Sequence, residues 1–254
     1  MRTVATTNQK GGTAKTTTAV NLAACLGEKG RRVLLVDLDP QACASAWYGV
    51  RDGGRGLLDV FTGNGNLADV VVQTDVEGVE LVPSSSWLSN VDKALAGEVG
   101  AEVIFRDRLA ALPDRWDVVL VDCPPSLGLL TISALAAVRD VLVPVEASVM
   151  ALAGLARLSE TVAVVRDRLN PGLSLSAILA CRVDIRRNLS GEVLEALRKA
   201  FGGAVLRAVI RENVRLAEAW SHGKPITVYD PNCHGAEDYR AVAVELLRNW
   251  SKNQ

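Results

Sequence analysis

The chain has 254 residues and a formal net charge of −1, with 49% hydrophobic and 22% charged residues. This balance is typical of a soluble globular protein. The near-zero charge excludes a global attraction to nucleic acid or anionic lipid, so any such binding needs a local patch. No apolar run approaches the ~20 residues of a transmembrane helix. The five scattered cysteines, without a Cys-x-x-Cys pair, favour reduced thiols in a cytosolic protein.

The first predicted unit is a β-branched strand over residues 3–7, a Gly-rich loop, and a helix with apolar residues at helical spacing over 18–29. A Gly-rich turn at a helix N-terminus presents backbone N–H groups and the positive end of the helix dipole to an anion. The loop therefore predicts a phosphate cradle, in which Lys15 reaches the β- and γ-phosphates and Thr16 ligates Mg²⁺. The ATP-binding residues of this cradle are Lys10, Gly11, Gly12, Thr13, Ala14, Lys15, Thr16 and Thr17.

This loop departs from the standard P-loop pattern. That pattern places glycine where this chain has Gln9 and Ala14, and this chain adds a second lysine, Lys10. If position 14 needs a positive φ, alanine costs on the order of 1 kcal/mol relative to glycine there. A Gly-rich turn that binds nothing is the alternative, and Lys-Thr-Thr at the start of a helix argues against it.

The next predicted strand, residues 33–37, is an apolar run that ends in Asp37. Such runs are typical of buried parallel strands, whose C-terminal ends carry ligand sites. Asp37 and Asp39 are two residues apart on an extended segment and share a face, so both carboxylates can approach the Mg²⁺–phosphate site. Taken alone, the same residues also fit a simple acidic turn.

The middle of the chain gives weaker patterns. Residues 49–75 are rich in glycine and predict a variable loop with one short helix around 57–61. A short strand follows over 79–83, and residues 88–112 have helical spacing that is interrupted near two glycines. The apolar run over 116–122 then ends in Asp122, which fits a Walker B strand whose acid accepts a hydrogen bond from metal-bound water or from Thr16.

The second half alternates strands and helices. We expect strands over 140–145, 175–181 and 204–210, helices over 150–169, 189–201, 214–220 and 235–250, and irregular structure over 225–232. This alternation predicts an α/β fold with a single doubly wound, mostly parallel sheet flanked by helices, a P-loop NTPase. We expect one domain over residues 1–254, without a separate N-terminal DNA-binding domain.

Basic residues gather late in the chain. Between Arg182 and Arg215 there are eight basic residues against four acidic ones, an excess of four in a chain that nets −1. Arginine clusters suit phosphate backbones, although a solvated, salt-bridged face explains the charge equally well. The eight are Arg182, Arg186, Arg187, Arg198, Lys199, Arg207, Arg211 and Arg215.

Three segments of the chain, which contain the Gly-rich loop and the acidic strand ends, resemble one family. The loop over 10–17 resembles the deviant Walker A sequence Lys-Gly-Gly-x-Gly-Lys-Thr-Thr of the ParA/MinD superfamily, with Ala14 as its one departure. Val-Leu-Leu-Val-Asp-Leu-Asp-Pro-Gln over 33–41 and Asp-x-Pro-Pro-Ser-Leu-Gly-Leu-Leu-Thr over 122–131 look like ParA segments. Pro40 and Gln41 favour the ParA/Soj-type partition ATPases over MinD proteins.

The resemblance implies a weak ATPase that acts as a nucleotide switch with ATP and Mg²⁺ as cofactors. Binding of ATP would close a homodimer in which Lys10 crosses to the partner's phosphates, while Asp39 orients the attacking water. The implied catalytic residues are Lys10, Lys15 and Asp39, the implied metal-site residues are Thr16, Asp37 and Asp122, and Pro231 and Asn232 are implied to lie near the adenine.

The resemblance also implies non-specific binding of double-stranded DNA through Arg186, Arg187 and Arg215. It further implies hydrolysis stimulated by a ParB-type centromere-binding protein, and a cytoplasmic, nucleoid-associated location without membrane binding. The family usually reads Ile-Pro-Arg-Asn-Val-Arg where this chain has Glu212 in place of the first arginine, so we expect weaker DNA affinity than usual.

Three alternatives stay open. A MinD-like membrane switch would need a basic amphipathic C-terminal helix, and the end of this chain offers only Arg248 and Lys252 as cations over 241–254. A small-molecule metabolic ATPase of the same fold would need a substrate pocket that the sequence does not reveal. A non-hydrolysing scaffold remains if Ala14 weakens the site.

Overall fold

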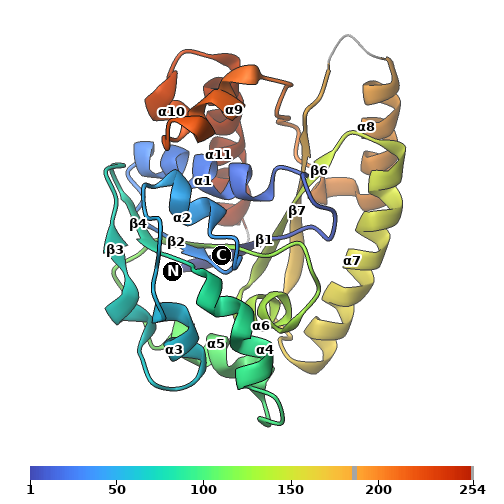
Figure 1. Ribbon diagram of the computed structural model, residues 1–254. Helices are drawn as coiled ribbons and strands as arrows, with labels where there is room; N and C mark the ends of the chain where they lie inside the picture. Colours follow the sequence, from blue (N-terminus) through green and yellow to red (C-terminus); the bar gives the residue numbers. More distant parts are fainter. Residues whose placement is uncertain (185–187, 253–254) are drawn as a thin grey trace.

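The computed structural model describes residues 1–184 and 188–252 of the chain (Figure 1). Its seven described strands form one sheet in the order β3-β4-β2-β5-β1-β6-β7, and all neighbours are parallel except β3 and β4. The strands are β1 (Arg2–Thr6), β2 (Val33–Asp37), β3 (Val72–Gln73), β4 (Val79–Val82), β5 (Val118–Asp122), β6 (Asp140–Glu146) and β7 (Ser174–Cys181). The predicted fold class is therefore confirmed.

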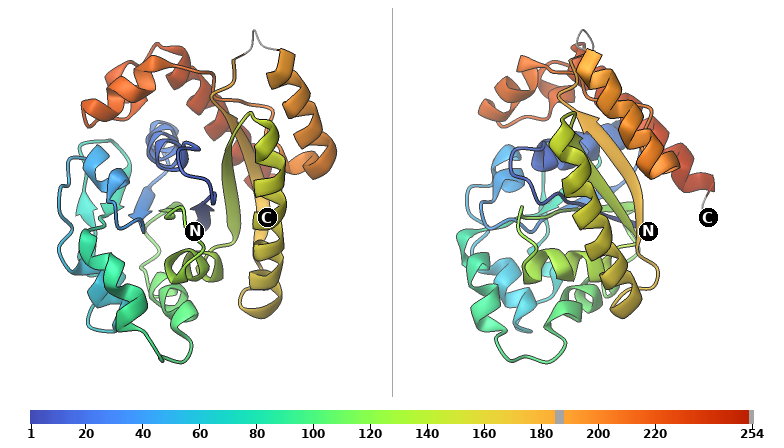
Figure 2. Two further views of the ribbon diagram at one scale, coloured as in Figure 1. Left: turned by 45° about the vertical axis from the view of Figure 1, so that its right-hand side comes forward. Right: turned by 90° about the vertical axis from the view of Figure 1, so that its right-hand side faces the viewer.

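Helices cover both faces of this sheet (Figure 2). Buried side chains of α1, α2 and α9 to α11 form one apolar cluster, and those of α3 to α8 form another. The α-helices are α1 (Lys15–Glu28), α2 (Cys43–Trp47), α3 (Gly56–Phe61), α4 (Val91–Ala94), α5 (Ile104–Ala110), α6 (Leu129–Ala137), α7 (Val149–Arg168), α8 (Asn188–Phe201), α9 (Val214–Ser221), α10 (Ile226–Tyr229) and α11 (His234–Lys252). The 3₁₀ turns are η1 (Leu67–Val70), η2 (Ser86–Asn90), η3 (Ala101–Val103) and η4 (Gly202–Ala204).

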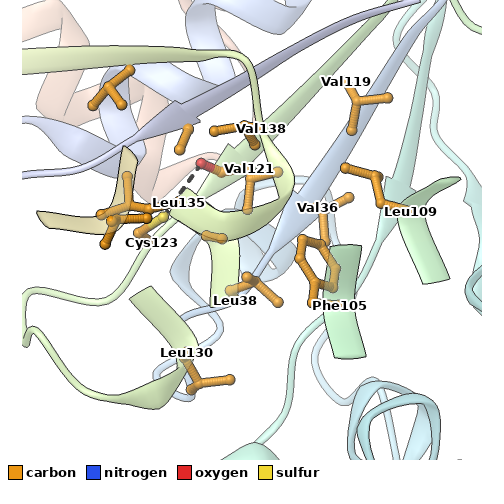
Figure 3. Packing of buried hydrophobic residues seen from close by; sticks show 14 of the residues in the cluster. Val36, Leu38, Phe105, Leu109, Val119, Val121, Cys123, Leu130, Leu135 and Val138 are labelled. Carbon is orange, nitrogen blue, oxygen red and sulfur yellow. Dashed lines mark hydrogen bonds between the residues drawn. The ribbon is translucent and has the colours of Figure 1, made fainter. Parts of the chain in front are cut away.

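Alternate residues of the central strands face the two clusters. In β2, Leu34 and Val36 belong to the cluster with α3 to α8, whereas Val33 and Leu35 belong to the cluster with α1 and α11. Figure 3 shows Val36 beside Phe105 of α5 in the first of these clusters. Because helices bury both faces, β2 and β5 are apolar at every position before their final aspartate, which is the pattern that predicted them.

The parallel register brings the acidic strand ends together. Asp37 of β2 pairs with Asp122 of β5, and Asp122 also pairs with Thr6 at the end of β1. The chain leaves β1 directly into the Gly-rich loop and enters α1. The loop and both acids therefore meet at the carboxyl edge of the sheet, where parallel sheets bind their ligands.

The predicted strand over residues 204–210 is wrong. Leu206 and Ile210 donate backbone N–H groups to Ile178 and Ala180 of β7 at 2.9 and 2.8 Å. These donors are four residues apart but their acceptors are only two apart, so the segment between them bulges away from β7. Two amides in the bulge donate to the carboxylate of Glu245 on α11, both at 2.9 Å, and take no part in a strand ladder.

Other differences lie where the sequence patterns are weak. The predicted interruptions of 88–112 are confirmed at Gly97 and Gly100, whose φ angles are 84° and 79°, and they separate η2 and α4 from η3 and α5. The edge strand β3 and the one-turn helix α10 were not predicted. β3 has two residues, paired with β4, and is too short to leave a periodic signal of its own.

Candidate functional site

Side-chain hydrogen bonds hold the Gly-rich loop between β1 and α1. Asn8 accepts a hydrogen bond from the Lys10 N–H at 3.1 Å and donates one to the Pro144 carbonyl of β6 at 2.8 Å. Thr13 Oγ1 donates to the Lys10 carbonyl at 3.1 Å. The loop is thus tied both to itself and to the neighbouring strand, which shapes it before a phosphate enters.

Ala14 has a left-handed backbone at the N-cap of α1, with φ 63° and ψ 27°. The sequence left open whether position 14 has a positive φ, and the structure shows that it does. An alanine in this conformation costs on the order of 1 kcal/mol relative to glycine because its Cβ crowds the carbonyl. Gly12 has φ 74° and meets the same demand without that strain.

The two loop lysines occupy different environments. Lys15 is only 8% exposed, and its Nζ lies 3.3 Å from the Lys10 carbonyl. Burial lowers the pKa of Lys15, and the carboxylates of Asp122 and Asp39 oppose that change. The Lys10 side chain is 53% exposed, and its Nζ pairs with Glu146 Oε2 at 3.3 Å. Lys15 therefore belongs to the cradle, whereas Lys10 lies on its outer rim.

The carboxylate of Asp37 accepts hydrogen bonds from neighbouring residues on both of its oxygens. Its Oδ2 accepts hydrogen bonds from the Ser45 N–H at 2.8 Å and the Ser45 hydroxyl at 2.7 Å, and its Oδ1 accepts one from the Asp39 N–H at 3.1 Å. Ser45 Oγ in turn accepts from the Ser84 N–H at 2.8 Å. Burial raises the pKa of Asp37 to about 6, and these hydrogen bonds oppose the rise. Asp37 thus shapes the turn that carries Asp39.

Asp122 is buried without such support. Neither carboxylate oxygen has a hydrogen bond of ordinary geometry from the described residues. Burial first, and then the charge of Asp37, raise the pKa of Asp122 well above its usual range, while the nearby Thr16 hydroxyl and Lys15 oppose this. A buried carboxylate in this state is costly unless a cation compensates it.

The donors around Asp122 fit magnesium. Mg²⁺ prefers hard oxygen ligands and combines one or two protein ligands with phosphates and water. The Thr16 hydroxyl and the orphaned oxygens of Asp122 supply that chemistry beside the cradle. Asp37 fits better in a supporting position, because its oxygens already accept three hydrogen bonds.

Asp39 follows β2 and faces the same site. It is 9% exposed, and its Oδ1 accepts a hydrogen bond from the Gln41 N–H at 3.0 Å. Its charge acts on Lys15, which places its carboxylate near the cradle. A carboxylate at this position is able to accept a hydrogen bond from a water molecule beside the phosphates.

A cleft of about 820 Å³ continues from the cradle. It begins at Ala14, Thr16 and Thr17 and runs between the end of β7, the segment over 210–214, and α9. Trp47 of α2 and Trp220 of α9 line it and make an edge-to-face contact, with ring centroids 5.2 Å apart. Its size and its position beside a phosphate loop suit a nucleoside.

The sequence missed most of the lining of this cleft. Its lining residues Cys43, Glu146 and Tyr239 come from distant parts of the sequence, and no local pattern connects them. Pro231 and Asn232, predicted near the adenine, are exposed and are not among the residues that line the cleft. Their contact with ATP stays a prediction.

The described arginines of the basic segment make contacts in different parts of the fold. Arg211 donates hydrogen bonds to Asp238 and Glu237 of α11, the shortest to Asp238 Oδ1 at 2.6 Å. Arg215 pairs with Glu218 at 2.7 Å and with Asp230 at 3.5 Å. Arg186 and Arg187, both predicted to bind DNA, lie outside the described residues.

The C-terminal helix α11 turns its apolar side inward. Tyr239, Val242, Leu246 and Trp250 are buried in the cluster that includes α1. That side is therefore covered by the protein itself. Across the described ranges, none of the helices combines the length and apolar character needed to cross a bilayer.

Comparisons with known proteins extend over the whole chain. Residues 1–175 match the family model described as an AAA domain. The chain is 42% identical over 248 residues to the sporulation initiation inhibitor protein Soj of Bacillus subtilis, covering 97% of this chain and 98% of that protein. It is 40% identical over 248 residues to the chromosome-partitioning ATPase Soj of Treponema pallidum, covering 97% of both.

A solved structure shows the same fold. Cobyrinic acid a,c-diamide synthase from Mycobacterium smegmatis, with bound ADP and magnesium, matches with a TM-score of 0.87 and 34% identity. The match covers 100% of this chain and 97% of that one. The similarity thus includes the sheet, the cradle and the C-terminal helices together.

Proposed function

The chain belongs to the AAA-domain family, as a P-loop ATPase of the ParA/MinD type, and from this premise we propose that it is an ATP-dependent DNA-partition ATPase. The observation that carries the proposal is the separation of the two loop lysines. Lys15 is buried in the cradle, and Lys10 lies at the rim with its side chain 53% exposed. One lysine serves the subunit's own phosphates, and the other reaches those of a second subunit.

ATP binds with its phosphates against the loop amides over residues 11–17 and against Lys15, and its base enters the cleft. Thr16 and Asp122 hold Mg²⁺, which neutralises charge on the phosphates when bound. The orphaned oxygens of Asp122 support this assignment. The M. smegmatis neighbour contains ADP and magnesium, which supports the same pair of ligands.

Hydrolysis depends on residues of both subunits. Asp39 orients the attacking water, because its carboxylate lies beside the cradle on a turn held by Asp37. Lys10 exchanges its contact with Glu146 for the phosphates of the partner, as an arginine finger would. The site is incomplete in one subunit, so turnover requires a homodimer.

The dimer couples nucleotide to DNA. In the closed dimer, Arg186, Arg187 and Arg215 of both subunits bind one duplex, so binding of double-stranded DNA becomes ATP-dependent by linkage. A ParB-type centromere-binding protein stimulates hydrolysis and releases the DNA. This cycle places the protein in the cytoplasm, associated with the nucleoid.

The test is binding to a duplex of arbitrary sequence with ATP, ADP or no nucleotide, across a salt series. We expect tight binding only with ATP, falling steeply with salt because phosphate contacts release counterions. The matched control is Arg157→Ala on α7, an exposed arginine without an ion pair among the described residues, which leaves binding unchanged.

The contrary result is also specific. Absence of DNA binding in every nucleotide state, with ATP hydrolysis intact, contradicts the proposal. Association with liposomes would then support a MinD-like switch, and ATP turnover that depends on an added small carboxylic acid would support a metabolic enzyme.

A further inference from the structure

We propose that a groove between α8 and α11 is a docking site for an acidic, amphipathic segment of a partner protein. The groove has a volume of about 920 Å³ and lies where the C-terminal ends of the two helices run side by side (Figure 2). We call it the basic groove, because its cations are Arg198, Arg207, Arg248 and Lys252. It shares no lining residue with the nucleotide cleft, so the proposal goes beyond the ATPase cycle.

The cations of the basic groove lack counter-ions. All four are exposed, and their side chains make no hydrogen bond or ion pair within residues 1–184 and 188–252. Elsewhere arginines are commonly paired, as Arg32 is with Asp117 and Arg240 with Glu28. Four like charges around one hollow repel each other, so a local anion stabilises them.

Among the described residues, Glu245 is the one carboxylate that lines the groove, and it already accepts hydrogen bonds. Glu245 Oε1 accepts a hydrogen bond from the Arg207 N–H, and its Oε2 accepts one from the Ala208 N–H, both at 2.9 Å. These bonds hold the bulge that follows η4. Glu245 therefore offsets one charge and leaves an excess of cations.

The lining between these cations includes apolar side chains. Ala241 is exposed, Ala208 and Val244 are half-buried, and Val205 is buried. A Cβ added at Gly202 would meet nothing within 4 Å, so the hollow extends to the backbone there. An apolar lining with a cationic rim matches a segment that presents acidic and apolar side chains together.

This lining separates a protein partner from DNA. Duplex DNA presents phosphates on a convex rod, and its apolar atoms lie mainly in its grooves, so it is a poor cover for Ala241 and Val244. The helix dipole explains the positions of only two of the four cations. Arg198 and Lys252 lie in the last turns of their helices, where cations are favoured. Arg207 lies outside any helix, so its position in the groove has no such origin.

The test uses a fluorescent peptide of Glu and Leu at helical spacing, with fluorescence anisotropy as the readout. We expect the wild type to bind this peptide at least tenfold more tightly than Arg207→Glu/Arg248→Glu does, because each reversal turns an attraction into a repulsion. The matched control is Lys93→Glu/Arg157→Glu, which reverses two exposed cations elsewhere. We expect that control to bind like the wild type.

Other outcomes of the peptide experiment would overturn the proposal. Equal binding of a Glu and Ser peptide, or equal binding by both double variants, overturns the proposal. It is also overturned if the peptide does not bind and the groove variant instead loses ATP-dependent binding of duplex DNA. If the groove double variant fails to fold, Arg207→Ser replaces it, with at least a threefold loss expected. Unchanged ATP turnover keeps this result separate from a failure of the proposed function.

Discussion

The phosphate loop and the basic segment between Arg182 and Arg215 concentrate charge in the sequence in similar ways, yet they fold differently. The loop stays together, because consecutive residues cover a single turn between β1 and α1. The basic segment spans the end of β7, α8, η4, a bulge and α9, so its described arginines lie apart. Arg182 and Arg211 line the nucleotide cleft, Arg198 and Arg207 line the basic groove, and Arg215 lies on α9.

This difference shows what a local motif predicts and what a charge count does not. Residues within one turn share a site whatever the rest of the chain does, because the backbone limits how far apart they can be. Residues spread over several elements share a surface only if packing places them there. The changes below should therefore have large effects in the loop and small, divergent effects in the basic segment.

The largest effect is expected for Lys15→Ala. Lys15 is buried in the cradle beside Asp122 and Asp39, so no neighbouring cation can replace it on the phosphates. We expect ATP turnover, measured as phosphate release, to fall by about 10²–10³-fold. Lys93→Ala on α4, an exposed lysine, serves as the control and should keep full activity. If the ATP turnover of Lys15→Ala stays within twofold of the wild type, the assignment of the loop as the phosphate-binding site is wrong.

Asp122→Asn should separate function from stability. Removing a buried, unsupported carboxylate stabilises the nucleotide-free protein by about 1 kcal/mol, which raises its Tm by ~2–4 °C. Magnesium-dependent ATP turnover should fall at least tenfold, since the asparagine is a weaker magnesium ligand. Calorimetry and phosphate release measure the two effects.

The control for Asp122→Asn is Asp117→Asn. Hydrogen bonds from Arg32 lower the pKa of Asp117 to about 2, so its neutralisation removes a favourable interaction and should lower the Tm. A lower Tm for Asp122→Asn as well would show that Asp122 has a structural partner, against its assignment to the metal site.

Within the basic segment, Arg215→Ala and Arg211→Ala should diverge. Arg215 is on the surface of α9 and can exchange Glu218 for a phosphate, so its loss should weaken ATP-dependent DNA binding about threefold to tenfold. Arg211 holds Asp238, so its loss should leave DNA binding nearly intact and destabilise the fold by about 1–2 kcal/mol. Filter binding and thermal unfolding distinguish the two variants. Equal losses of DNA binding would instead indicate that both arginines belong to one DNA-binding surface.

The smallest effect is expected for Ala14→Gly. Glycine removes the strain of the left-handed backbone but adds entropy to the unfolded chain, so we expect a gain of about 0.5–1 kcal/mol in the free energy of unfolding. Ala42→Gly is the matched control, since Ala42 has a φ of 52° at the N-cap of α2. Both variants should gain stability, and only Ala14→Gly should also change the affinity for ATP. If neither variant has a higher free energy of unfolding than the wild type, the left-handed alanines are not strained.

Much of the fold was predictable because its strands are apolar runs and its helices are periodic. The positions of the loop and of Asp37, Asp39 and Asp122 were predictable because each lies at or just after the C-terminal end of a strand, and parallel strands end at the same edge. The bulge over 204–210 was not, because Glu245 of α11 takes two of its amides. The partner of that carboxylate is set by tertiary packing, which local β-propensity does not contain.

The cleft was the least predictable part of the site. Trp47 and Trp220 meet across 173 positions of sequence and form an edge-to-face pair. No spacing connects them, and only the folded chain brings α2 to α9. The same applies to Glu146, whose contact with Lys10 depends on the register between β1 and β6.

The central claim is that each active site takes Lys10 from the partner subunit, and mixing two inactive variants tests it most directly. Lys10→Ala subunits keep Asp39, and Asp39→Ala subunits keep Lys10. Each alone should hydrolyse little ATP. If Lys10 acts across the interface, a mixed dimer contains one complete site, and an equal mixture should recover up to about a quarter of wild-type turnover for random pairing. A mixture that stays as inactive as its components would contradict the account, because it would place Lys10 and Asp39 in the same subunit's site.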